Sequence, residues 1–359
     1  MNELRKQIGQ MLMVGLASDA LKEEELALLR DFPVGGFILF KHNCSSAERI
    51  RALCDSLWEI APDPPPFIAI DQEGGTAHRL PEPFTHFPFA ARVGERGDPS
   101  LAYRAGHATA TELSLVGINL NFAPVLDVNS NPNNPVIGDR SFGADPQQVI
   151  AFSERWIQGT RDAGIISCGK HFPGHGDTDK DSHVHLPCVD RNLEELRAVE
   201  LPPFVHVCKL QIESLMTAHV VYRALDDEFP ATLSAKIVTG ILRESLGYDG
   251  VVFSDALEMK AISDHYGERE TSALCIQAGV DVLLYSRPML NVTRVFEFLY
   301  NLAESDPMIR DRVESSYRRI LKLKRRYLKS FSGVPEGEIL GRLLRLNHKR
   351  IVEQIHGRL

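Results

Sequence analysis

Residues 67–75 read Phe-Ile-Ala-Ile-Asp-Gln-Glu-Gly-Gly, so a four-residue apolar run ends directly in a carboxylate and is followed by two glycines. A short, uninterrupted apolar run is typical of a strand in a parallel sheet, where both faces of the sheet are covered. Residues 250–255 repeat the pattern as Gly-Val-Val-Phe-Ser-Asp. We therefore predict a fold of buried parallel strands whose carboxyl ends carry polar side chains.

Eight such runs alternate with helical patterns along the chain, which predicts an α/β fold with a single (β/α)8 TIM-like barrel. No G-x-G-x-x-G follows the first run, and this counts against a dinucleotide-binding sheet. We expect residues 1–290 to form the barrel and residues 291–359 to form C-terminal helices that pack on it within the same domain. The expected strands are residues 11–16, 35–40, 67–70, 119–123, 164–168, 214–218, 250–254 and 280–284. The expected helices between them are residues 22–30, 46–60, 99–116, 146–163, 193–208, 234–246 and 268–277.

The charge of the chain is uneven along its length. Its 359 residues include 40 Lys and Arg against 48 Asp and Glu, a formal net charge of −8, which argues against nucleic acid as the main partner. Residues 310–359 nevertheless hold 14 Lys and Arg and only 5 Asp and Glu. This segment is either a basic arm for nucleic acid or anionic lipid, or a pair of solvated amphipathic helices. We favour helices, because Val313, Tyr317, Ile320 and Lys324 recur at helical spacing.

The cysteines and the first residues bear on the compartment. The 6 cysteines form no C-x-x-C pair, and scattered thiols in a long chain favour a reducing, cytoplasmic location. Residues 1–20 faintly resemble a signal peptide, but Gly9 and Gln10 interrupt the apolar run, and residues 11–16 also fit a first strand. We favour the strand. No apolar run approaches the roughly 18 residues of a membrane helix, so we expect no membrane partner.

Reactive side chains follow five of the expected strands. Because catalytic groups of barrels lie at the carboxyl ends of the strands, we expect these side chains to share one rim. They are Asp71 with Arg79 after the third strand, Asp127 and Arg140 after the fourth, Lys170 and His171 after the fifth, His219 after the sixth, and Asp255 after the seventh. Packing alone does not call for charged groups at so many strand ends, so we interpret the set as functional.

Residues 170–187 hold the densest cluster of reactive groups and read Lys-His-Phe-Pro-Gly-His-Gly-Asp-Thr-Asp-Lys-Asp-Ser-His-Val-His-Leu-Pro. An EF-hand is excluded, because Ser182 and Cys188 occupy positions that require Gly and Glu. A metal-dependent barrel hydrolase remains possible, since His and Asp are ligands of zinc. Alternatively, Asp181 hydrogen-bonds to His183 and tunes that imidazole for proton transfer, as a general acid/base requires.

These motifs resemble those of the β-N-acetylglucosaminidases of glycoside hydrolase family 3, specifically the short, single-domain bacterial type that recycles peptidoglycan. The longest matching motif is K-H-F-P-G-H-G-x4-D-S-H-x-x-L-P at residues 170–187. The other matching segments are residues 71–79, 134–142, 216–219 and 254–259. The family often has D-Q-E-G-G-R-V-x-R, whereas residues 76–78 read Thr-Ala-His here, so we expect local sugar contacts to differ.

The resemblance implies a retaining exo-β-N-acetylglucosaminidase that hydrolyses terminal non-reducing β-linked N-acetylglucosamine from cytoplasmic peptidoglycan fragments, such as N-acetylglucosaminyl-anhydro-N-acetylmuramic acid peptides. It implies Asp255 as the nucleophile of a covalent intermediate, and His183 paired with Asp181 as the acid/base. The implied substrate-binding residues are Asp71, Arg79, Arg140, Lys170, His171 and His219. We expect no cofactor, no metal, and a monomer rather than an obligate oligomer. The alternatives are the metal-dependent hydrolase and a sugar-binding protein without turnover.

Overall fold

Eight parallel strands form one sheet that closes on itself. The computed structural model describes residues 2–61, 63–182, 184–288, 292–329 and 334–358. The sheet order is β10-β1-β2-β3-β4-β5-β7-β9, and the two ends meet where Phe253 pairs with Val282 directly before β10. The strands are β1 (Leu12–Gly15), β2 (Gly36–Leu39), β3 (Phe67–Ile70), β4 (Leu120–Asn121), β5 (Ile166–Phe172), β7 (Ser214–Thr217), β9 (Val251–Phe253) and β10 (Leu283–Pro288). The predicted (β/α)8 barrel is thereby confirmed, and each expected strand overlaps an observed one.

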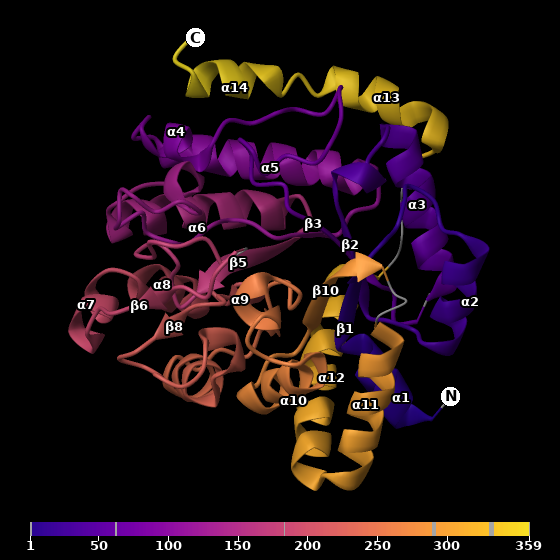
Figure 1. Cartoon of the computed structure of the whole chain (residues 1–359). Helices are drawn as coiled ribbons and strands as arrows, with labels where there is room; N and C mark the ends of the chain where they lie inside the picture. Colours follow the sequence, from indigo (N-terminus) through magenta and orange to yellow (C-terminus); the bar gives the residue numbers. More distant parts are fainter. Residues whose placement is uncertain (1, 62, 183, 289–291, 330–333, 359) are drawn as a thin grey trace.

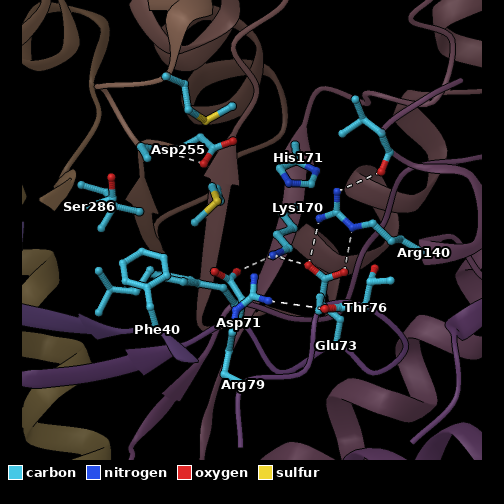
Figure 2. A pocket seen from close by; sticks show the side chains of 18 of the residues that line it. Phe40, Asp71, Glu73, Thr76, Arg79, Arg140, Lys170, His171, Asp255 and Ser286 are labelled. Carbon is cyan, nitrogen blue, oxygen red and sulfur yellow. Dashed lines mark hydrogen bonds and ion pairs between the residues drawn. The ribbon is translucent and has the colours of Figure 1, made fainter. Parts of the chain in front are cut away.

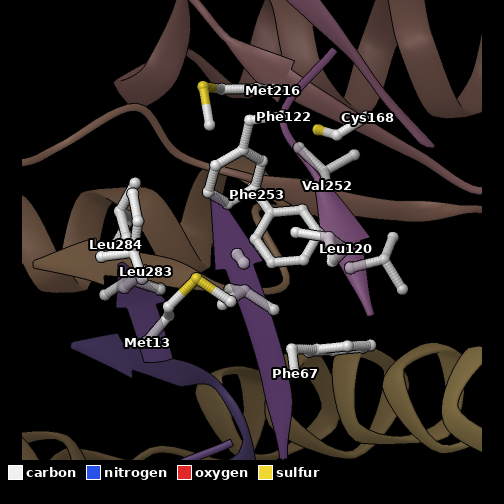
Figure 3. Close-up of a cluster of buried hydrophobic side chains, with 14 of the residues drawn as sticks. Met13, Phe67, Leu120, Phe122, Cys168, Met216, Val252, Phe253, Leu283 and Leu284 are labelled. Atoms are coloured by element: carbon white, nitrogen blue, oxygen red, sulfur yellow. The ribbon is translucent and has the colours of Figure 1, made fainter. Parts of the chain in front are cut away.

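Large apolar side chains fill the inside of the barrel (Figure 3). The ring centroids of Phe67 and Phe253 are 5.8 Å apart, and those of Phe122 and Phe253 are 5.4 Å apart, both edge to face. These three side chains and Met13 are fully buried. The barrel interior is therefore a packed core rather than a channel, and a ligand can enter only at its rim.

Helices cover the outside of the barrel (Figure 1). Ser46 and Asp145 cap two of them, since their side chains accept the backbone N–H groups of Arg49 and Gln147. The helix expected over residues 193–208 is divided in two, because Pro202 and Pro203 lack the N–H that a helix interior requires. The barrel helices are α2 (Glu23–Asp31), α3 (Ala47–Ile60), α5 (Pro99–Leu115), α6 (Pro146–Asp162), α7 (Leu193–Ala198), α8 (Leu201–Lys209), η4 (Lys236–Ser245) and α10 (Glu268–Ala278).

Shorter elements lie in the connections between these strands and helices. They are η1 (Lys41–Asn43), α4 (Ala90–Gly94), η2 (Gly138–Arg140), η3 (Ala231–Leu233), α9 (Lys260–Ser263) and the two-stranded sheet of β6 (Cys188–Val189) and β8 (Val221–Tyr222). Helix α9 follows the strand that leads to Asp255, and η2 carries Arg140. These two short helices therefore position side chains at the rim.

Helices from both ends of the chain pack on the barrel. They are α1 (Glu3–Gln10), α11 (Val292–Ser305), α12 (Pro307–Tyr327), α13 (Glu336–Arg345) and α14 (Lys349–Ile355). In Figure 1 the last two helices are yellow: α14 lies along α5 and α13 lies beside α3, whereas α11 and α12 lie beside α1. Among the described residues, no helix is both long and apolar enough to cross a membrane.

The amphipathic pattern expected in the basic segment is confirmed in α12, whose buried face includes Val313, Tyr317, Ile320 and Lys324. Lys324 Nζ donates to Gln10 Oε1 at 2.6 Å and to the carbonyl oxygen of Gly35 at 2.7 Å. It also lies 4.6 Å from the ring centroid of Phe67, the first residue of β3. This side chain therefore seals the amino-terminal end of the barrel.

The fully buried Asp281 connects the closure of the sheet to two outer helices. Its Oδ2 accepts the Val252 N–H at 2.9 Å and an Nη2–H of Arg243, from η4, at 2.5 Å. Its Oδ1 accepts the Ser316 hydroxyl at 2.7 Å and Arg319 Nη1 at 3.3 Å, both from α12. One carboxylate thus holds the last strand interface, η4 and α12 together.

We predict that Asp281→Asn lowers the free energy of unfolding by about 3 kcal/mol, because Arg243, whose side chain is only 9% exposed, loses its charged partner. Urea unfolding at pH 7 measures the change. Asp249→Asn is the matched control, since the exposed Asp249 pairs with the same Arg319. This variant should lower the free energy of unfolding by less than about 1 kcal/mol. Equal losses in the two variants would contradict the role given to Asp281.

Candidate active site

A cavity of about 420 Å³ opens at the carboxyl ends of the strands. Most of the side chains singled out from the sequence line it. They are Asp71, Arg79, Arg140, Lys170, His171, Asp181 and Asp255. Figure 2 labels all of these except Asp181 and shows Asp255 facing the cluster around Lys170 from the other side of the rim. The expected convergence of strand ends therefore holds for these residues.

The buried carboxylate of Glu73 joins two cations at the floor of the cavity (Figure 2). Its oxygens accept Arg140 Nε and Nη2, both at 2.9 Å, and Oε1 lies 2.6 Å from Lys170 Nζ. Lys170 also donates to Asp71 Oδ1 at 2.8 Å. Burial alone would raise the pKa of the Glu73 carboxyl, but Arg140 and Lys170 hold it well below its usual range. The four side chains thus form a rigid array of charges.

The same array keeps Lys170 charged. Burial alone would lower the pKa of the Lys170 ammonium, but the carboxylates of Asp71 and Glu73 raise it above its usual value. A fixed ammonium and a fixed guanidinium beside one another are well suited to hydrogen-bond the hydroxyl oxygens of a sugar. Glu73 had no role in our sequence prediction, although it stands within the quoted D-Q-E-G-G segment.

A second buried carboxylate, that of Asp127, holds His171. Its Oδ2 lies 2.7 Å from His171 Nδ1, and its Oδ1 accepts the backbone N–H groups of His171 at 3.1 Å and His175 at 2.7 Å. Burial opposes ionisation of Asp127, but the neighbouring His171 lowers the pKa of this carboxyl overall. An ionised Asp127 accepts the Nδ1–H of His171, so Nε2 is turned away from that carboxylate. The sequence prediction placed Asp127 at a strand end but gave it no role.

Asp255 follows β9 and is kept ionised by its surroundings. Burial would raise the pKa of this carboxyl, but the imidazoles of His219 and His171 and the Ala256 N–H, which donates to Oδ1 at 2.7 Å, bring it below its usual value. His219 is fully buried, and its Nε2 donates to the Ala256 carbonyl oxygen at 3.0 Å. It does not line the cavity. His219 therefore supports the segment that presents Asp255.

Arg79 lies beside the segment in which the chain departs from the family pattern. Its backbone N–H donates to Gln72 Oε1 at 2.9 Å, and its Nη1 to the Thr76 carbonyl oxygen at 3.4 Å. His78 turns to Gln72 and stacks on His86 with ring centroids 4.1 Å apart. Burial, aided by His86, lowers the pKa of His78 to about 4, so this ring is neutral at pH 7. The departure adds no charge to the cavity.

The segment after β5 returns to the rim with Asp181 at the cavity. Asn134 holds its beginning, since its Nδ2 donates to the carbonyl oxygens of His175 at 2.8 Å and Gly176 at 3.0 Å. His183 lies outside the described residues. Within the residues that are described, no three His, Cys, Asp or Glu side chains are grouped to hold a metal ion.

Comparisons with known proteins show which family and which solved structures this chain is similar to. Residues 3–323 match the sequence model of the glycosyl hydrolase family 3 N terminal domain. A β-hexosaminidase of Alkalilimnicola ehrlichii is 37% identical over 348 residues, which cover 91% of this chain and 98% of that protein. The structure of a family 3 β-N-acetylglucosaminidase from a Paenibacillus species has a TM-score of 0.94 and 38% identity, covering 99% of this chain and 68% of that one. NagZ from Neisseria gonorrhoeae, in complex with N-trifluoroacetyl-D-glucosamine, has a TM-score of 0.79 and 31% identity, and 97% of each chain is covered.

The depressed pKa of Glu73 predicts a pH-dependent contribution to stability. A carboxyl whose pKa is lower in the folded state stabilises the fold above its unfolded pKa of about 4.3, and this contribution is lost as the pH falls through the folded value. We predict that the difference in free energy of unfolding between the wild type and Glu73→Gln is largest above about pH 5 and shrinks toward pH 3. Urea unfolding at several pH values measures it. The exposed Glu95, changed to Gln, serves as control, and a pH-independent difference for Glu73→Gln would contradict the prediction.

Proposed function

This chain belongs to glycoside hydrolase family 3, and from that membership we propose that it is a retaining exo-β-N-acetylglucosaminidase that removes terminal, non-reducing β-linked N-acetylglucosamine. The observation that carries the proposal is the placement of the ionised Asp255 across one cavity from the charge array of Asp71, Glu73, Lys170 and Arg140. The cavity falls within the size range of small-molecule sites. Its floor rests on a packed barrel, so it suits a chain end better than the middle of a polymer.

The proposed reaction has two steps. In the first, an Asp255 oxygen attacks the anomeric carbon, the glycosidic bond breaks, and His183 gives a proton to the departing oxygen. In the second, His183 takes a proton from water, and the resulting hydroxide displaces Asp255 and releases the sugar. Asp181 would hold the imidazole of His183 in the required tautomer. An imidazole in this role departs from the usual pair of carboxylates.

The remaining predicted residues would bind and orient the sugar. Lys170 and Arg140 would donate to hydroxyl oxygens, and His171 would present Nε2 because Asp127 holds Nδ1. Asp71 would accept a hydrogen bond from a sugar hydroxyl, and Arg79 would close the open side of the cavity. His219 would act through the Ala256 segment rather than by contact with the sugar.

We further propose that the substrates are cytoplasmic peptidoglycan fragments, including N-acetylglucosaminyl-anhydro-N-acetylmuramic acid peptides, and that the enzyme acts as a monomer. The length match to the gonococcal NagZ, which binds an N-acylated glucosamine in its structure, supports N-acetylglucosamine as the terminal sugar. The motif at residues 170–187 supports the single-domain recycling type.

We predict that Asp255→Asn lowers kcat/KM for p-nitrophenyl N-acetyl-β-glucosaminide by at least about 10³-fold, because a neutral amide cannot form the glycosyl ester. Steady-state kinetics measure the loss, and an unchanged melting temperature shows that the variant folds. The exposed Asp264, changed to Asn, is a matched control. Full activity of Asp255→Asn would refute the proposed nucleophile.

The covalent intermediate can be tested separately in the wild type. Incubation with 5-fluoro-N-acetylglucosaminyl fluoride should add one sugar to the peptide that contains Asp255, because the fluorine slows hydrolysis of the ester more than its formation. Peptide mass spectrometry locates the adduct. Stoichiometric zinc together with chelator-sensitive activity and no adduct would instead favour the metal-dependent hydrolase.

A further inference from the structure

The imidazole of His175 is buried at the base of the segment that carries Asp181. Its Nδ1 lies 2.8 Å from Thr178 Oγ1, and its Nε2 lies 3.0 Å from Ser182 Oγ. Its backbone is fixed as well, because its N–H donates to Asp127 and its carbonyl oxygen accepts Asn134 Nδ2. The side chain of His175 is therefore fixed in position, and Ser182, seven residues later, hydrogen-bonds to it.

The hydrogen bonds around Thr178 assign the tautomer of His175. The Thr178 hydroxyl donates to the His175 carbonyl oxygen at 3.1 Å, and in this arrangement Thr178 Oγ1 accepts from His175 Nδ1–H. Burial, with the nearby His171, lowers the pKa of His175 to about 4, so the ring is neutral at pH 7. A neutral ring with a proton on Nδ1 has an acceptor at Nε2. The Ser182 hydroxyl therefore donates to Nε2.

The backbone of Ser182 makes a second contact, with the segment that follows Asp255. Its backbone carbonyl oxygen accepts the N–H of Ala261 at 3.3 Å, and Ala261 belongs to α9, the short helix after Asp255. Ser182 is buried, whereas Asp179 and Lys180 before it are exposed. The segment is thus held at Ser182, between the base at His175 and the element that follows Asp255. Asp181 precedes this point and His183 follows it in the sequence.

We propose that the hydrogen bond from Ser182 to His175 is a latch that holds the acid/base segment over the cavity, so that Ser182 and His175 are positioning residues for proton transfer to the leaving group. This proposal rests on the function proposed above. Because neither side chain lines the cavity, both act through the segment. Loss of the latch should impair protonation of the departing oxygen and leave sugar binding and the attack of Asp255 nearly unchanged.

Two substrates that differ in their need for a proton test the latch. N,N′-diacetylchitobiose has an alkoxide leaving group that must be protonated, whereas 2,4-dinitrophenyl N-acetyl-β-glucosaminide leaves without a proton. We expect Ser182→Ala to lower kcat/KM for the disaccharide at least about tenfold more than for the dinitrophenyl glycoside. Ser182→Thr keeps the hydroxyl and should restore most of the disaccharide activity.

Ser153→Ala is the matched control, since Ser153 is equally buried and donates to a backbone carbonyl oxygen on α6, away from the cavity. Ser153→Ala should lower kcat/KM for neither the disaccharide nor the dinitrophenyl glycoside. If Ser182→Ala does not fold, Ser182→Cys gives the same comparison with a weak donor. Equal losses on both substrates, or no loss on either, would overturn the latch. A wild type that cleaves neither substrate would count against the proposed function instead.

Discussion

Eight strands that run in one direction leave no sheet edge only if the two strands at the ends of the sheet order meet, since each strand then has a neighbour on both sides. Here β9 and β10 meet where Phe253 pairs with Val282, and β10 continues beside β1. Closure gathers the carboxyl ends of all the strands at a single rim. The charge array, His171 and Asp255 lie at or after the carboxyl ends of β3, β4, β5 and β9, and they face one cavity because of this closure.

Two buried carboxylates, those of Glu73 and Asp127, hold the side chains at the rim in place, and each accepts hydrogen bonds from several partners. Glu73 holds Arg140 and Lys170, and Asp127 holds His171 and the backbone of His175. A buried charge that is paired and fully hydrogen-bonded costs little in stability, but it fixes the geometry of every partner. The side proposed to bind the sugar and the base of the proposed acid/base segment are consequently held by these two carboxylates and their partners.

Most of the fold could be predicted from the sequence, because buried parallel strands are continuous apolar runs and the polar groups at their ends stand out. The division of residues 193–208 was missed, although Pro202 and Pro203 signalled it. The roles of Glu73 and Asp127 could not be predicted, because they depend on contacts between residues 44 to 97 positions apart. Spacing along the chain also could not show that His219 lies behind Asp255, since only packing decides which face of a strand end meets the cavity.

The packed interior of the barrel has a consequence for how a polymer would be degraded. Phe67, Phe122 and Phe253 close the path below the cavity, and Lys324 seals the far end. A released monosaccharide must therefore leave through the mouth by which the substrate entered. For the proposed exo-acting enzyme, the shortened substrate would block that mouth until it dissociates, so one sugar would be removed per encounter, without sliding along the substrate.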